Sequence, residues 1–170
     1  MPQREARIMD HAQRHGFPVP RVREVRADAL ILERISGRSM GRDLRRRPWM
    51  AARHVQTLAE LHDRLHLIPF EGARLVHFDL HPDNVLMSAS GPVVIDWTNA
   101  RSGDGAQDVA MTWLILETSA GLPGWLLARL FRSRAGTETI RRGLPEARAF
   151  RLADPNVREA ERARARRAVP

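Results

Sequence analysis

Three polar side chains in one stretch of the chain have the types and spacing that phosphoryl transfer requires. Asp79 and Asn84 lie five residues apart in a predicted loop, and Asp96 follows the apolar run Val93–Ile95. A carboxylate in such a loop can orient a substrate hydroxyl and accept its proton. An amide oxygen and a second carboxylate are the hard ligands that magnesium prefers. The spacing therefore predicts Asp79 as general base and Asn84 with Asp96 as magnesium ligands.

The elements around these residues explain how they meet. Short strands over 85–87 and 93–95 form a predicted hairpin, so Asn84 and Asp96 flank the same hairpin and can converge on one ion. Asp108 falls in the first turn of a predicted helix, where backbone N–H groups favour a carboxylate, and it could brace the catalytic loop. His77 is predicted to have a structural role in holding that loop.

An alternative interpretation uses His77, Asp79 and His81, which alternate along an extended segment. Three such ligands would indicate a metal-dependent hydrolase. That interpretation leaves Asn84 and Asp96 without a role, and the phosphoryl-transfer interpretation accounts for both. The role of His81 stays open.

Hydrophobic periodicity and turn residues predict a mostly helical α+β protein. Trp97 and Trp113 are expected in the core, and His62 beside the apolar stripe of its helix. Asp154-Pro155 is expected to start a final arginine-rich helix. The predicted helices cover 3–15, 39–46, 49–67, 105–119 and 122–131, and a hairpin covers 21–26 and 29–35.

Composition and charge limit the classes of partner and location that the chain can have. The chain has 170 residues, no cysteine and a net charge of +8, and every basic residue other than histidine is an arginine. The arginine runs are expected to be solvated and lack aromatic interleaving, so no nucleic-acid partner is predicted. The apolar window 109–131 contains Glu117 and Pro123, which favours two buried helices over a membrane span. Without an apolar N-terminal region, the predicted location is cytoplasmic.

Four separated blocks resemble the aminoglycoside phosphotransferase family, the small-molecule branch of the protein-kinase-like fold. They are the His-x-Asp-x-His-Pro-x-Asn-Val-Leu loop at 77–86, Val-Ile-Asp-Trp at 94–97, Ala-Arg-Ser-Gly at 100–103 and Asp-Val-Ala at 108–110. The resemblance runs from about Arg4 to Leu130. It implies a kinase-like C-terminal lobe, ATP and Mg²⁺ as cofactors, and a hydroxyl group of a small molecule as acceptor.

The resemblance also implies roles by position. Asp79 corresponds to the catalytic base, and Asn84 and Asp96 to the magnesium ligands. The segment Glu33, Arg34 and Ile35 is similar to the hinge whose backbone meets adenine. Glu5 resembles the helix acid that pairs with the phosphate-binding lysine of the family.

One part of the family pattern does not appear in the chain. The family has glycine-rich strands and a lysine before its first helix, and this sequence contains no lysine. We therefore expect a single, N-terminally truncated domain over 1–170. Its parts would be a remnant of the N-terminal lobe over 1–35, a C-terminal lobe over 36–152 and an arginine-rich helix over 153–170. Arg4 or Arg7 could substitute for the missing cation.

Two alternatives remain open from the sequence. The chain could be a non-catalytic, truncated kinase-like binding module, or a fragment from an incomplete gene model that begins upstream of Met1. An uncovered face on the first helix and hairpin predicts self-association.

Overall fold

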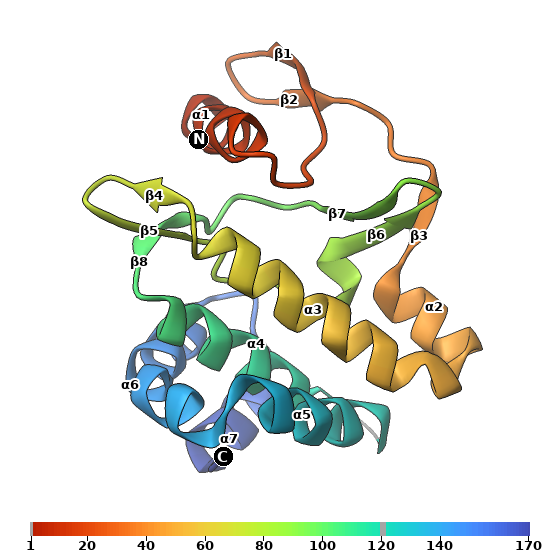
Figure 1. Cartoon of the computed structure of the whole chain (residues 1–170). Coiled ribbons are helices and arrows are strands. Elements are labelled where there is room, and N and C mark those ends of the chain that lie inside the picture. Colours follow the sequence, from red (N-terminus) through yellow and green to blue (C-terminus); the bar gives the residue numbers. More distant parts are fainter. Residues whose placement is uncertain (1, 120–121) are drawn as a thin grey trace.

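The computed structural model describes residues 2–119 and 122–170, and it divides into a small N-terminal part and a larger helical part (Figure 1). Helix α1 (Pro2–Arg14) and the hairpin of β1 (Val22–Val25) and β2 (Leu30–Leu32) lie at one end. Helices α4 to α7 gather at the other end, and α3 runs between the two. The remaining elements are β3 Gly37–Ser39, α2 Met40–Arg46, η1 Pro48–Met50, α3 Ala51–Leu65, β4 Pro69–Phe70, β5 Ala73–Val76, η2 Pro82–Asn84, β6 Val85–Ser88, β7 Gly91–Val94, β8 Arg101–Gly103, α4 Gly105–Thr118, α5 Leu122–Ala135, α6 Thr137–Ala153 and α7 Glu159–Arg167.

The strands form small antiparallel sheets that carry the predicted site. Within the described residues the sheets are β1-β2, β3-β6-β7 and β4-β5-β8. The predicted hairpin is the β6-β7 pair, in which Val85 lies opposite Val94. Helices dominate the rest of the chain, so the α+β, mostly helical fold class is confirmed.

Helix α4 is the centre of the core. Its side chains from Val109 to Leu116 are all buried, because α5 and α6 pack against it. Trp97 and Trp113 are buried as predicted, and so is His62, at 1% exposed. The two helices expected in the apolar window are present, and the turn expected between them falls on 120–121, outside the described residues. None of the described helices has the length and apolarity that a bilayer crossing needs.

The end of the chain differs from the sequence prediction. The expectation that Asp154-Pro155 starts the last helix is wrong, since α7 begins at Glu159. The Asp154 carboxylate instead accepts the Asn156 N–H at 2.8 Å and closes a turn. Helix α6 was not predicted, and it contains Pro145, a residue that usually ends a helix. Arginines then dock α7: Arg148 donates to the carbonyls of Ala165 and Ala168, and Arg164 donates to Thr118 O.

A buried carboxylate fixes the loop that carries Asp79. The Asp108 oxygens accept the backbone N–H of His77 at 3.0 Å and of Phe78 at 2.7 Å. The His66 ring donates to Asp108 at 2.9 Å. Burial alone would raise the pKa of Asp108, but the facing His62 and His66 rings hold that pKa well below its usual range. Asp108 is therefore the brace that its helix position predicted.

His77 connects the same loop to the strand before Asp96. Its Nε2 lies 3.2 Å from Ile95 O, and its ring packs against Trp97 with centroids 5.0 Å apart. Full burial lowers the pKa of His77 to about 4. The ring is therefore neutral near pH 7, and its Nε2–H donates to the Ile95 carbonyl.

The crossing of α4 and α6 depends on one glycine. A Cβ at Gly143 would lie 2.0 Å from Ala106 O and 2.6 Å from Gln107 N, which are backbone atoms. We expect Gly143→Ala to lower the free energy of unfolding by about 1–3 kcal/mol, although alanine is the better helix former. Urea denaturation measures this loss. Arg142→Ala, on the exposed face of the same helix, is the control, and an equal loss in both variants would contradict the close crossing.

Stability should fall in mild acid because His77 is buried in its neutral form. The unfolded chain protonates this histidine near pH 6.5, and the folded chain only near 4. A depressed histidine pKa stabilises the fold above the unfolded value, and that contribution is lost as pH falls from 6.5 to 4. The loss attributable to His77 is about 3 kcal/mol. The lowered pKa of His62 acts in the same direction.

The matched variant is His77→Gln, whose amide can donate to Ile95 O without titrating. Its unfolding free energy, measured by urea denaturation at several pH values, should vary less between pH 6.5 and 4 than that of the wild type. His15→Gln, at an exposed position, serves as control. An unchanged slope in His77→Gln would count against a neutral, buried His77.

Candidate functional site

The loop between β5 and η2 brings Asp79 and Asn84 into contact. The Asp79 side chain is 20% exposed. Asn84 Nδ2 donates to Asp79 O at 2.9 Å and to Asp79 Oδ2 at 3.2 Å. Because the amide nitrogen of Asn84 points at Asp79, its Oδ1 is left to face a different ligand. The loop thus presents a carboxylate and an amide oxygen, as a base and a metal ligand require.

Asp79 has the electrostatic environment of a base. Burial raises the pKa of Asp79, and the nearby Asp96 carboxylate adds to the rise. His81 and Arg151, together with the hydrogen bond from Asn84, oppose that shift. A carboxylate with a raised pKa accepts a proton more readily at neutral pH.

Asp96 lies two residues after the end of β7 and is exposed. The Ile95 N–H donates to Asn84 O at 3.0 Å, so the backbone joins the two predicted magnesium ligands. Asp96 has a φ of 62°, and Phe78, next to Asp79, has a φ of 63°. This left-handed backbone costs a residue with a side chain on the order of 1–3 kcal/mol, and such strain concentrates at functional sites.

Packing holds Phe78 in that conformation. The Arg101 guanidinium lies 3.5 Å from the centroid of the Phe78 ring. Phe150 of α6 meets the same ring edge-on, with centroids 5.0 Å apart. Together with the N–H bond to Asp108, these contacts offset the backbone strain and set the direction of the Asp79 side chain.

Helix α1 packs beside the turn that follows Asp96. Arg4 donates to Ala100 O at 2.8 Å, so it is engaged in a backbone contact. Burial raises the pKa of Glu5, the Asp96 carboxylate raises it further, and a hydrogen bond with the Trp97 backbone opposes the shift. The structure therefore brings Glu5 to the Asp96 side of the site.

The segment predicted as an adenine hinge forms an open loop after β2. The Glu33 N–H donates to Arg21 O at 2.8 Å, and its Oε2 lies 3.3 Å from Arg21 N. In the described part of the chain, the backbone N–H groups of Arg34 and Ile35 have no hydrogen-bond partner. No hydrogen bond of the described residues joins this loop to Asp79.

The alternative metal site of His77, Asp79 and His81 does not assemble. His77 is turned to Ile95 O, and His81 Nε2 lies 3.9 Å from Asp79 Oδ1. Within the described residues, the histidines and acids close enough to share a cation are His62, His66 and Asp108. That group is already engaged in holding the loop.

Two contributors to the site were missed by the sequence analysis. Arg151, at the end of the unpredicted helix α6, pairs with Glu161 of α7 and opposes the rise of the Asp79 pKa. Thr112 accepts from His62 Nε2 at 2.9 Å and donates to Leu80 O at 2.6 Å, which fixes the residue after Asp79. Neither residue lies in a motif. Only a prediction of which faces of α4 and α6 point toward the loop could have found them.

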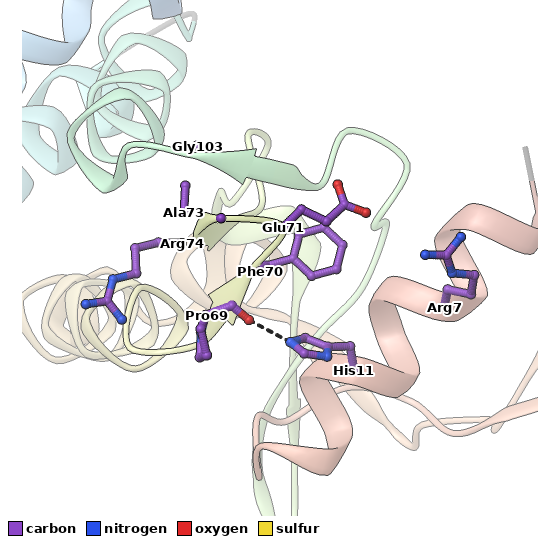
Figure 2. Close-up of a pocket in the computed structure, with 9 residues that line it drawn as sticks. Arg7, His11, Pro69, Phe70, Glu71, Ala73, Arg74 and Gly103 are labelled. Atoms are coloured by element: carbon purple, nitrogen blue, oxygen red, sulfur yellow. Dashed lines mark hydrogen bonds between the residues drawn. The ribbon is translucent and has the colours of Figure 1, made fainter.

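The structure also has a hollow whose lining does not include Asp79. Figure 2 shows it between α1, which supplies Arg7 and His11, and the β4-β5 hairpin, which supplies Phe70 and Glu71. Its volume is about 720 Å³, and His11 Nε2 lies 2.8 Å from Pro69 O across it. Arg7, considered above as a substitute cation, lines this hollow, which contains none of the residues assigned to the phosphoryl-transfer site.

Comparisons with known proteins agree with this geometry. Residues 68–150 match the model of the phosphotransferase enzyme family. A crystal structure of a thermostable mutant of the aminoglycoside phosphotransferase APH(4)-Ia, in its apo form, superposes with a TM-score of 0.61 and 19% identity. The alignment covers 94% of this chain and 73% of that one, and it shows that the fold is shared.

A protein of Methanoculleus marisnigri (strain ATCC 35101 / DSM 1498 / JR1), named a probable bifunctional tRNA threonylcarbamoyladenosine biosynthesis protein, is 31% identical over 93 residues. That match covers 55% of this chain and only 16% of the relative's own length. The match over residues 68–150 and the shared fold agree with the family resemblance predicted from the sequence.

Proposed function

We propose that this chain carries the catalytic loop of an ATP- and magnesium-dependent phosphotransferase whose acceptor is a hydroxyl group of a small molecule. One observation carries the proposal: the Asn84 amide nitrogen donates to Asp79, which leaves the Asn84 side-chain oxygen available to a metal ion beside the proposed base. The match of residues 68–150 to the phosphotransferase enzyme family supports the reaction class. The tRNA modification in the name of the Methanoculleus marisnigri relative is not assigned to this chain, because the match covers 16% of that protein.

The donor set fits magnesium. Asn84 Oδ1 and the exposed Asp96 carboxylate are hard oxygen ligands, and few protein ligands suit an ion that keeps several waters or phosphate oxygens. When bound, magnesium would neutralise phosphate charge during transfer. The Glu5 carboxylate on the Asp96 side of the site would further favour a cation there.

Asp79 would act on the acceptor. Its carboxylate would orient the hydroxyl and take its proton as the oxygen attacks the γ-phosphorus, while the bond to the β-phosphate oxygen breaks. His77 and Asp108 keep the loop in place for this step. The free N–H groups of Arg34 and Ile35, with the Glu33 backbone, are the proposed contacts for adenine.

A non-catalytic binding module is the second candidate. The sequence has no lysine to clamp the phosphates, and losing one preorganised donor costs on the order of 10²–10³ in rate in other enzymes. The two candidates differ in turnover, since both could bind a nucleotide. We also propose a cytoplasmic location and self-association through α1 and the β1-β2 hairpin.

Calorimetric titration with ATP and Mg²⁺ tests the metal assignment. We expect the wild type to bind and Asp96→Asn to bind at least about tenfold more weakly, because it removes the charged ligand. Asp10→Asn, an exposed acid on α1, is the control and should bind like the wild type. No binding by the wild type would rule out the proposed function for this chain.

Release of ADP over a panel of hydroxylated acceptors tests the base. Asp79→Asn should lower turnover by about 10²–10⁴ and leave the calorimetric affinity for ATP and Mg²⁺ nearly unchanged, because Asp79 is not assigned to the metal. Nucleotide binding without turnover in the wild type would favour the binding module.

A further inference from the structure

A separate cavity of about 560 Å³ opens beside the catalytic loop. It lies between α2, the start of α3, α4 and α5, and the loop contributes His81, Pro82 and Asp83. His81 Nε2 lies 3.9 Å from Asp79 Oδ1, so one end of the cavity is next to the proposed base. The volume falls in the range of small-molecule sites, roughly 300–1,000 Å³.

Most of the cavity wall is apolar. Aliphatic side chains from α2, α4 and α5 form it, and Pro48 and Pro82 extend it. Two tryptophans neighbour lining residues in the chain and are themselves exposed: Trp49 follows Pro48 and is 75% exposed, and Trp125 is 54% exposed. The aliphatic lining residues are Leu44, Ile115, Leu116, Leu126 and Leu127.

The charges in the cavity are already paired. Asp83 is the one carboxylate among the described lining residues. Its Oδ1 accepts from Ser39 Oγ at 2.9 Å and lies 3.6 Å from Arg45 Nη2. A polycationic ligand would therefore find a single carboxylate in the described lining, with an arginine beside it, and the net charge of +8 on the chain would oppose its approach.

We propose that this cavity holds the acceptor and selects an alcohol with an uncharged, apolar body, in place of a polycationic aminoglycoside. This inference rests on the proposed function, because only a transfer reaction has an acceptor. The apolar body packs against the α4 and α5 side chains, and the hydroxyl extends past His81 to Asp79. Hydrophobic burial supplies the affinity, and the loop supplies the orientation.

Binding without nucleotide tests the inference, using phenylhexanol as the apolar alcohol and kanamycin as the polycation. Calorimetry gives the affinity, and tryptophan emission reports the site. Trp97 and Trp113 are 0% and 1% exposed, so a blue shift on binding would come from Trp49 or Trp125. We expect phenylhexanol to bind with a blue shift, and kanamycin to give neither heat nor shift.

The variant Leu126→Asp places a charge on the cavity wall at a residue that is 42% exposed, and it should weaken phenylhexanol binding by about tenfold or more. Leu67→Asp makes the same change at a residue 73% exposed beyond the other end of α3, and should have no effect. If Leu126→Asp unfolds at a lower temperature than the wild type, Ala51→Phe is used instead. Its ring fills the same cavity from α3 and should also weaken phenylhexanol binding.

Three results would overturn the inference: binding of kanamycin and not phenylhexanol, no binding of either probe, or equal phenylhexanol affinity in the wild type and the cavity variants. None of them bears on the transfer reaction, because these titrations contain no ATP. Conversely, a wild type that binds phenylhexanol but not ATP with Mg²⁺ would remove the proposed function and leave an apolar ligand site.

Discussion

The site depends on the Asp108 carboxylate, buried at 0% exposure in the first turn of α4. An ionised carboxylate inside a protein is costly unless hydrogen bonds replace the lost water. Here the N–H groups of His77 and Phe78 and the His66 ring provide those bonds. The same bonds fix the backbone on the N-terminal side of Asp79. The hydrogen bonds that make the buried charge tolerable are therefore the same ones that position Asp79, the proposed base.

The strained residues follow from this arrangement. Phe78 and Asp96 both adopt a left-handed backbone. Phe78 precedes the proposed base Asp79, and Asp96 is itself a proposed magnesium ligand. A loop that was merely flexible would relax to ordinary angles. In this loop, Asp108 binds the backbone N–H groups of His77 and Phe78, and Arg101 and Phe150 pack against the Phe78 ring. Because the supports come from α4, β8 and α6, the site requires the whole helical part to be folded.

The sequence predicted the local pieces well and the distant contacts poorly. The β6-β7 hairpin, α3 and the bracing role of Asp108 could be read because each depends on periodicity or on a helix N-terminus. Helix α6 was missed because Pro145 and Gly143 argue against a helix locally, and the close α4-α6 crossing overrides that preference. Arg151 was missed with it. The start of α7 was misplaced because Asp154 caps a turn as readily as a helix.

The way α7 is held has a consequence for how such chains can diverge. Its arginines and those of α6 donate to main-chain carbonyls of Thr118, Asp154, Ala165 and Ala168. A carbonyl acceptor is present whatever side chain the residue carries. Substitutions at the accepting positions therefore leave these bonds available, and only the arginines are constrained. Pairwise covariation between related sequences would therefore report the Arg151–Glu161 pair of side chains between α6 and α7, and would miss these main-chain bonds.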